Sequence, residues 1–555
     1  MMLLVLVLGI SVFWAGWTGV CLASNYAQAQ KLGFPIVVLP ISTMNILWII
    51  VQPAVIALIE RLHGTSHFTR FGGRDWHFRE KARHHLEFGD AWLLVTPGQV
   101  WFQVADPDAI IDIFQRRTHF TRPIELYQLL NVFGHNAATV GWVDWKRHRK
   151  VIAAPFNEGT NHLVWTESLK QASDMIRDWK QTRASGKLGL QKDTRTLALN
   201  VLAATGFGRS YKFHASGRPH DDEIGSYREA LSIIMDNALF MMLVPPKILC
   251  SRLVPKSWQK IGHATHSFKR YMMDLLEQEK RLVSEGKAGA NHLTAGLLRA
   301  LEIHSNPKPN GTEIRGDPVV RGLTVNELLG NIFLINFAGH DTTANTLAFA
   351  ILHLAANLHV QNWVAEEVRG VLGEKPSEDW EYESVFPRLK RPLAVMYETV
   401  RLFPPIMALP KYTSGGSQDL TIGGSTVTVS SGIYVVPSLL AIHTHPRHWG
   451  DDALEWKPSR WIDADGEFLV PARGTYFPWS EGAQNCPGRK FSQVEFVAVV
   501  ASLFQSLLVR PVLAEGESME QARKRLLEIA EKSSHGVLLR MKNADDVRLS
   551  WVLAE

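Results

Sequence analysis

The chain is 555 residues long, is 46% hydrophobic and carries a formal net charge of +5. This length allows several domains, the apolar content suffices for a large core, and the small net charge without any long basic block argues against nucleic acid as a partner. The three cysteines, Cys21, Cys250 and Cys486, are too few for a disulfide framework and favour a reducing compartment for most of the chain.

The N-terminal segment, residues 1–23, has no charged side chain and is long enough to cross a bilayer, which takes about 20 residues. Trp14 and Trp17 suit a membrane–water interface. Because the basic residues begin at Lys31, the positive-inside rule predicts a single-pass anchor with the rest of the chain in the cytosol. The alternative, a cleaved signal peptide, would have a basic start and a shorter apolar core.

Residues 24–84 form a second segment. The apolar stretch 36–59 is interrupted by Pro40 and Pro53, so we expect it either to dip into the membrane or to pack on the domain that follows. Residues 63–73, which include Gly72 and Gly73, predict a polar hinge. The main domain would then extend over residues 85–545.

The remaining pattern predicts a mainly α fold with a smaller β-rich region. Thr324 and Glu327 match a capping box, and no helix breaker follows until about Leu358, so this stretch predicts the longest helix, apolar on most faces and central to the fold. Further helices are expected from Asp106-Pro107, through most of 108–280, and at 389–402 and 491–508; strands are expected in 91–104, 420–429 and 432–437, and a polar linker at 283–322.

Cys486 lies in a glycine-framed loop, Phe477–Lys490, directly before the helix predicted at 491–508. Backbone N–H groups at a helix start should lower the pKa of its thiol. A single unpaired cysteine between Gly482 and Gly488 suits a soft metal ligand, and the alternative is a buried structural cysteine.

Four motifs in this chain resemble those of the cytochrome P-450 superfamily, the haem-thiolate monooxygenases. The resemblance covers roughly residues 85–540 and is strongest to membrane-anchored members from filamentous fungi. It implies the cytochrome P-450 fold, preceded by a transmembrane helix, and haem b bound through Cys486. The motifs are Ala338–Thr343, Glu398-x-x-Arg401, Trp456–Trp461 with Arg460, and Trp479-x-x-Gly482-x-x-x-Cys486-x-Gly488.

The resemblance assigns the middle of the longest helix to oxygen activation. Ala338 and Gly339 would let the helix pass close to the flat haem, Asp341 would relay protons, and Thr342 would orient water or reduced oxygen. His340 would be a pocket-wall or hydrogen-bonding residue. The alternative is a core helix whose threonine hydroxyl bonds a carbonyl one turn back.

Glu398 and Arg401 lie one helical turn apart. The resemblance implies a buried network with Arg460 that fixes the cysteine loop, whereas the alternative is a surface ion pair of little energetic value.

The haem propionates need cationic or hydrogen-bonding partners, which the resemblance places at Trp145, Arg149, His443 and Lys411. Further basic side chains form either a solvated face or a patch for an acidic reductase. These are Lys146, Arg147, Lys150, Arg489 and Lys490.

Two positions depart from the family pattern. Trp479 stands where phenylalanine is usual, and we hypothesise that its indole N–H donates to the sulfur of Cys486. Gln484 stands where arginine or histidine is usual, so one propionate would lose a charged partner and depend more on Lys411 or His443.

The resemblance implies insertion of one atom of O2 into an apolar small molecule, as in terpenoid, polyketide or alkaloid secondary metabolism, at the endoplasmic reticulum membrane with the catalytic domain facing the cytosol. Electrons would come from a separate NADPH–cytochrome reductase, because no flavin or nicotinamide fingerprint is found. The alternatives are a haem-thiolate isomerase, dehydratase or peroxide-driven oxygenase, and a non-enzymatic membrane haem sensor.

Expected pocket walls are residues 123–141, 205–250, 333–342, 405–409 and 533–537, with Phe133, Phe207, Phe337 and Leu409 as apolar candidates. Asn310-Gly-Thr312 is a glycosylation sequon whose use would contradict a cytosolic location.

Overall fold

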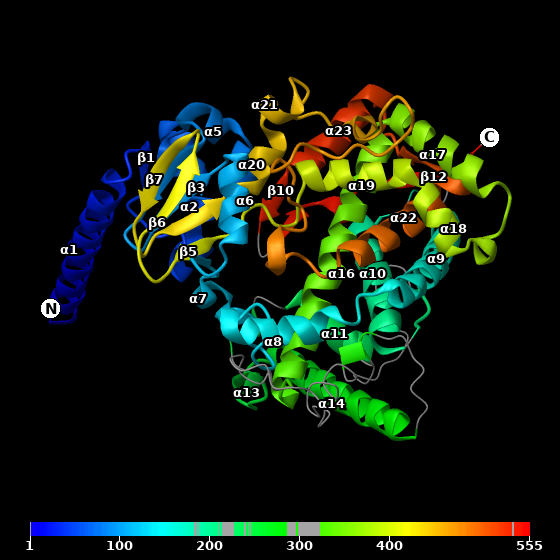
Figure 1. The fold of residues 1–555 in the computed structure, drawn as a ribbon, viewed down its shortest axis with the longest axis horizontal. Coiled ribbons are helices and arrows are strands. Elements are labelled where there is room, and N and C mark those ends of the chain that lie inside the picture. Colours follow the sequence, from blue (N-terminus) through cyan, green and yellow to red (C-terminus); the bar gives the residue numbers. More distant parts are fainter. Residues whose placement is uncertain are drawn as a thin grey trace, which may run out of the picture.

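The computed structural model describes residues 2–181, 188–208, 210–213, 227–237, 246–285, 322–535 and 538–554, together with residues 186, 240, 241, 244, 293, 296 and 297. A sheet-rich lobe lies beside a larger helical lobe, and α1 (Met2–Gln30) extends away from the sheet-rich lobe (Figure 1). Most of the linker predicted at 283–322, and the sequon at 310–312, lie outside the described residues.

The sheet-rich lobe is built on one six-stranded sheet with the order β1-β2-β3-β8-β5-β4. β2 (Ala91–Val95) and β3 (Val100–Val104) form the predicted antiparallel pair, and β3 pairs in parallel with β8 (Tyr434–Pro437). β6 (Gln418–Ile422) and β7 (Ser425–Val429) form the predicted hairpin. The other strands of the main sheet are β1 (Ile36–Val38), β4 (Phe120–Thr121) and β5 (Lys411–Thr413).

The segment at residues 24–84, predicted to precede the main domain, contacts this sheet. β1 pairs in parallel with β2, and the Asn25 side chain donates to the Thr96 carbonyl at 2.9 Å. The predicted hinge contains α3 (His67–Phe71), because Ser66 and Thr69 form a capping box. These backbone and side-chain bonds join the segment to the main domain.

The apolar stretch after β1 forms α2 (Ile46–His63), which continues through Pro53. Trp48, Gln52 and Ile56 are buried on one face, whereas Leu47 and Ile50 on another are 73% and 69% exposed. Within the described part of the chain, α2 is the helix that is long and apolar enough to span a membrane. The buried face of α2 therefore fits the expected packing on the domain, and its exposed apolar face fits the expected contact with a membrane.

The longest helix, α16 (Val325–Ala356), crosses the helical lobe as predicted (Figure 1). Thr324 and Glu327 form its capping box, and most of its residues are buried. It packs against α10 (Leu190–Phe207), α19 (Lys390–Leu402), α22 (Arg489–Ser506) and α23 (Met519–Glu531). The predicted helices at 389–402 and 491–508 correspond to α19 and α22.

The predicted helical character of 108–280 is confirmed by α6 to α14, and the remaining elements complete the two lobes. They are α4 (Trp76–Glu80), α5 (Arg83–Phe88), α6 (Pro107–Gln115), α7 (Ile124–Tyr127), α8 (Trp142–Ala153), α9 (Glu158–Gln181), α11 (Tyr227–Asp236), α13 (Pro246–Leu249), α14 (Lys256–Ser284), α17 (Leu358–Leu372), α18 (Tyr382–Val385), α20 (Leu439–Thr444), α21 (Pro446–Trp449), β9 (Leu507–Pro511), β10 (Ser533–His535), β11 (Leu539–Met541) and β12 (Leu549–Leu553).

Candidate functional site

One stripe of α16 is left uncovered in the middle of the helix. Ala338 is exposed and Thr342, one turn later, is half-buried, although the neighbouring His340 and Asp341 are buried. The Thr342 hydroxyl donates to the Ala338 carbonyl at 2.8 Å, the local bond that was the alternative to a catalytic role. Gly339 serves a different purpose from the predicted one, because an added Cβ would lie 3.3 Å from Leu202 of α10. It allows the two helices to approach closely.

Cys486 lies in the loop before α22 and is exposed. Its backbone N–H donates to the Trp479 carbonyl at 2.9 Å, which closes the loop on itself. Gly482 has φ +71°, and an added Cβ would lie 3.0 Å from the Phe114 carbonyl of α6. A side chain at residue 482 would therefore push the loop away from α6.

The pKa of the Cys486 thiol does not follow the simple helix-start expectation. Desolvation by surrounding protein atoms raises this pKa, while the Gly488 N–H and the Arg149 guanidinium lower it. Desolvation is the largest of these effects, so the predicted lowering is wrong for the protein alone. A metal cation bound to the sulfur would favour the thiolate.

Trp479 does not donate to the sulfur as hypothesised. Its indole N–H donates to the Ser492 hydroxyl on α22 at 3.2 Å, and the Arg489 guanidinium lies 5.3 Å from its ring centroid. The polar edge of Trp479 therefore binds the helix that follows the loop. Trp479 supports the position of Cys486 through this contact.

Three cationic side chains near the cysteine loop bond only neutral groups. The Lys411 ammonium donates to the Gln484 amide oxygen at 3.0 Å, and Arg149 donates to the Asn485 carbonyl at 2.8 Å and to its side-chain oxygen at 2.6 Å. Arg122, which belongs to none of the sequence motifs, donates to the Ala137 carbonyl at 2.6 Å.

Desolvation lowers the pKa of Arg122 and of Arg149, and it lowers that of Lys411 to about 7. Among the described residues, no carboxylate forms an ion pair with any of the three. Lys411 is buried, and Arg122 and Arg149 are half-buried. Withdrawing a cation from water without an anionic partner is costly. These side chains therefore create a site for an anionic group that is not part of the chain.

Gln484, one of the two positions that depart from the family pattern, accepts the hydrogen bond of Lys411. Trp145 lies one turn before Arg149 on α8, is 6% exposed and stacks on Trp142 with ring centroids 4.9 Å apart. α8 thus carries the predicted aromatic–arginine pair toward the cysteine loop.

The predicted contact of His443 with a haem propionate stays a prediction, since its buried Nδ1 has no hydrogen-bond partner among the described residues. Its ring is fully buried, and its Nε2 accepts a hydrogen bond from the Phe477 backbone N–H at 2.8 Å. Burial and the nearby Arg401 guanidinium lower the pKa of His443 to about 3, so the ring is neutral. Through Nε2, His443 supports the start of the cysteine loop.

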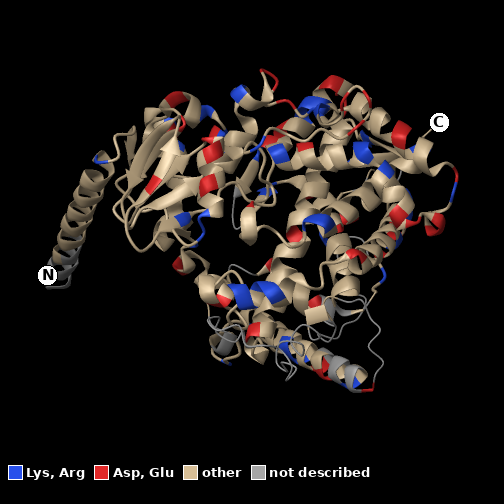
Figure 2. Cartoon of the chain, viewed as in Figure 1, with Lys and Arg blue, Asp and Glu red and all other residues tan. Residues whose placement is uncertain are grey.

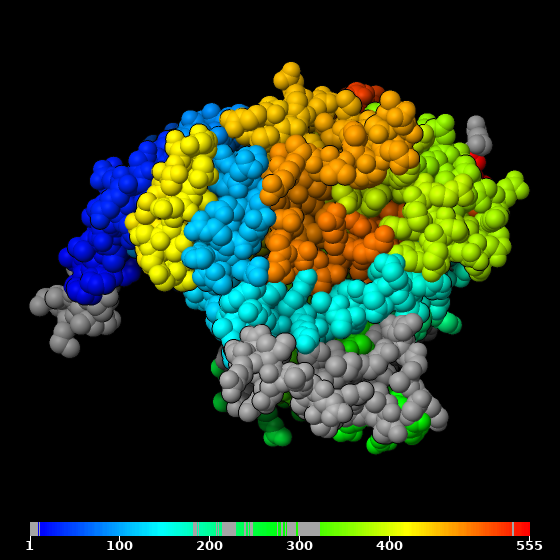
Figure 3. All heavy atoms as spheres, in the orientation of Figure 1, coloured from blue at the N-terminus to red at the C-terminus, as the bar shows by residue number. Residues whose placement is uncertain are grey.

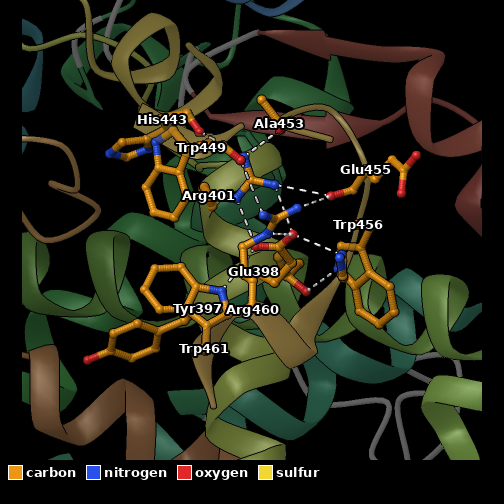
Figure 4. A network of polar contacts seen from close by, with 12 residues as sticks. Tyr397, Glu398, Arg401, His443, Trp449, Ala453, Glu455, Trp456, Arg460 and Trp461 are labelled. Carbon is orange, nitrogen blue, oxygen red and sulfur yellow. Dashed lines mark hydrogen bonds and ion pairs between the residues drawn. The ribbon is translucent and has the colours of Figure 1, made fainter. Parts of the chain in front are cut away.

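The predicted network around Glu398 is present and buried (Figure 4). Arg401 donates to both carboxylate oxygens of Glu398 at 2.8 Å, and Arg460 donates to one of them at 2.9 Å. The Trp461 indole and the Lys457 backbone N–H also donate to Glu398, at 3.0 and 2.8 Å. Glu398 and Arg401 have no exposed surface, which excludes the alternative of a surface pair.

This network reaches the cysteine loop through His443. Arg401 donates to the carbonyls of His443 and Ala453 at 2.8 and 2.6 Å, and to that of Glu455 at 3.1 Å (Figure 4). His443 in turn holds the Phe477 backbone N–H. The Glu398–Arg401 pair thereby fixes the first residue of the loop that ends in Cys486.

Asp341 is surrounded by cationic side chains that the motif did not reveal. Arg195 of α10 donates to it at 2.7 Å, Arg540 of β11 forms a second ion pair, and His340 Nε2 lies 3.1 Å away. Arg195 and Arg540 lie 146 and 199 residues from Asp341 in the chain, so only the tertiary structure could identify them.

The proposed apolar pocket residues divide between two cores. Phe133 and Phe337 both contact Phe333, with ring centroids 5.4 and 6.0 Å apart. Leu409 packs against the core of the sheet-rich lobe. The Phe207 side chain and residues 214–226, 536 and 537 are outside the described part.

A flat, anionic, metal-containing cofactor fits these observations. The uncovered stripe on α16 provides space within the fold, and Cys486 provides a soft ligand. Three buried or half-buried cations without carboxylate partners provide the charge for two carboxylates. Haem has these properties.

Comparisons with known proteins agree with this fit. A family model for cytochrome P450 matches residues 72–535. A cytochrome P450 monooxygenase of Arthrobotrys oligospora is 27% identical over 95% of this chain and 94% of its own length. The phomenoic acid biosynthesis cluster cytochrome P450 monooxygenase of Leptosphaeria maculans is 26% identical over 90% of each chain. The crystal structure of the cytochrome P450DA haem domain shares the fold, with a TM-score of 0.66, 18% identity and coverage of 88% of this chain and 96% of that one. With the family match extending over most of its length, this chain belongs to the cytochrome P450 family and is an oxidoreductase of the monooxygenase type.

Proposed function

We propose that this protein binds haem b through Cys486 and inserts one atom of O2 into an apolar small molecule, with electrons from an NADPH–cytochrome reductase. The observation that carries the proposal is a group of three cations without carboxylate partners, the buried Lys411 and the half-buried Arg122 and Arg149. They would hold the haem propionates together with Trp145. Haem bound to a thiolate supplies an iron that activates O2 and favours O–O cleavage.

Two side chains of α16, Asp341 and Thr342, would deliver protons on the side of the cofactor away from Cys486. The Thr342 hydroxyl donates its hydrogen to the Ala338 carbonyl, so the hydroxyl oxygen of Thr342 can still accept a hydrogen bond from water. Asp341 would supply protons to that water. The presence of both side chains favours oxygen activation over isomerase or dehydratase chemistry, which needs no such relay.

The reductase would dock where basic side chains gather around the cysteine loop. Lys146 and Lys150 of α8 and Arg489 and Lys490 of α22 are exposed; we call these four residues the proximal patch. Figure 2 shows the basic residues of α8, and Figure 3 shows the cysteine-loop segment on the same face, bordered by α8. Arg147 is excluded because it pairs with Glu327 at 2.6 Å.

Membrane attachment would come from α1 and α2. Exposed apolar side chains lie on both helices, including Phe13 and Trp17 on α1 and Leu47 and Ile50 on α2. Such surfaces favour a lipid environment. We propose the endoplasmic reticulum membrane, with the main domain in the cytosol.

The substrate would be an apolar secondary metabolite. Phe133, Phe333 and Phe337 form an aromatic group at and beside α16, which suits a hydrocarbon-rich molecule. The Leptosphaeria relative, named for a biosynthetic cluster, supports this class of substrate.

The reduced, CO-bound absorption spectrum tests the proposal. A strongly red-shifted Soret band is expected for the wild type and should be lost in Cys486→Ala, while Cys250→Ala, which removes another exposed cysteine, should keep it. Substrate-dependent oxidation of NADPH in the presence of reductase tests the reaction. An unshifted wild-type band would overturn thiolate ligation.

A further inference from the structure

The basic side chains around Asp341 come from three separate elements. His340 belongs to α16 itself, Arg195 to α10 and Arg540 to β11. His340 Nδ1 faces the Asn336 carbonyl at 3.1 Å while its Nε2 faces Asp341.

This environment keeps Asp341 ionised. Burial by itself would raise the pKa of its carboxyl, but His340, Arg195 and Arg540 outweigh burial and hold the pKa well below its usual range. A carboxylate held in this way cannot take up and pass on a proton near neutral pH. Proton delivery through Asp341 therefore requires at least one of these cations to move away.

Arg540 is the partner best placed to move. The Arg540 side chain is 39% exposed, whereas that of Arg195 is 21% exposed and is also tied to Asp236 of α11 at 2.8 Å. His340 is fixed to the same helix as Asp341. Arg540 has no second acidic partner within the described residues.

The element that carries Arg540 also borders the expected substrate pocket. β11 pairs with β10 in an antiparallel hairpin, and the Leu539 backbone N–H donates to the Pro405 carbonyl at 3.2 Å. Residues 405–409 and 533–537 are two of the predicted pocket walls. A molecule that fills the pocket and shifts this hairpin would shift Arg540 with it.

We propose that Arg540 is a positioning residue that holds Asp341 in a non-donating state until pocket occupancy displaces the β10–β11 hairpin. Arg540 thereby links binding of an apolar molecule to proton delivery and limits wasteful reduction of O2 in an empty pocket. This inference rests on the proposed monooxygenase function. It adds a side chain outside the four sequence motifs to the control of the reaction.

A double-mutant cycle with an azole tests the link between Arg540 and the pocket. Clotrimazole is the probe, because an azole nitrogen binds haem iron, the ring system fills an apolar pocket, and binding is read from the Soret band. If binding must break the Arg540–Asp341 pair, R540Q should lower the Kd about tenfold in the wild-type background. In the D341N background, where the ion pair is already absent, R540Q should change the Kd less than twofold.

R525Q is the matched control, because Arg525 pairs with the Glu517 carboxylate at 2.7 Å on α23 and its side chain is exposed to a similar extent, 36%. It should change the Kd less than twofold. An unchanged Kd in R540Q, or an equal change in both backgrounds, would overturn the inference.

A second readout concerns the proton. Reductase-driven O2 consumption without substrate should rise severalfold in R540Q as the pH falls below 7, because Asp341 then faces only His340 and Arg195, while R525Q should match the wild type. An R540Q profile that matches the wild type would also overturn the inference. If the wild type has no red-shifted CO band, the proposed function itself fails. If the band is normal but R540Q leaves the clotrimazole Kd unchanged, only the role of Arg540 is refuted.

Discussion

Replacing Lys411 by methionine should stabilise the haem-free protein and weaken its hold on haem. Lys411 is 6% exposed and bonds only the neutral Gln484 side chain. Desolvation and the nearby Arg122 lower the pKa of its ammonium from 10.5 to about 7. Methionine has a similar length and needs no anionic partner, so it removes the cost of burying the charge.

The sign and size of the effect follow from proton linkage. Below pH 7 the ammonium is charged in both the folded and the unfolded protein, so the cost is fully present; above pH 10.5 it is neutral in both, and the cost is lost. Each pH unit between the two pKa values corresponds to about 1.4 kcal/mol, which gives a cost of up to about 5 kcal/mol at pH 7. The wild type should therefore gain stability relative to Lys411→Met as the pH rises from 7 to 10.5.

Urea unfolding of the haem-free proteins at pH 7 and pH 9 measures this difference, with Lys524→Met, at an exposed site, as the control. Haem titration gives the complementary result. Because bound propionates restore the charged lysine, the haem affinity of the wild type relative to that of Lys411→Met should fall by up to about tenfold per pH unit above pH 7. The affinity of Lys411→Met should be lower at pH 7, and the comparison cancels the proton that the Cys486 thiol releases to bind iron in both proteins. Equal pH dependence in the two proteins would refute this account of the cation site.

Three further substitutions test the support of the cysteine loop. Arg401→Met should lower the free energy of unfolding by about 3–5 kcal/mol, since it leaves the buried Glu398 charge without its main partner. The control Arg525→Met should lower it by less than about 1 kcal/mol. Chemical denaturation distinguishes these values. Trp479→Phe should leave the Soret position and the redox potential unchanged, because its N–H bonds Ser492; a shift in either would revive the proposed bond to sulfur. Gly482→Ala should cost about 1–3 kcal/mol and reduce haem retention, because of the positive φ and the crowded carbonyl beside it; full retention after gel filtration would contradict this.

The sequence alone identified the elements whose local chemistry is distinctive. Thr324 and Glu327 defined the start of α16, and the glycine frame marked the cysteine loop. Glu398 and Arg401 could be paired because they lie one helical turn apart. Each of these features depends on residues close together in the chain, where periodicity and spacing carry the information.

The tertiary structure decided the partners. Arg122 reached the cation site, and Arg195 and Arg540 reached Asp341, from distant segments with no motif of their own. It also placed His443 behind the loop, and it turned Trp479 toward Ser492, whose hydroxyl competed with the expected contact. The chain sequence thus determined which chemical groups are available, whereas long-range packing determined which charges face each other and hence which protons can move.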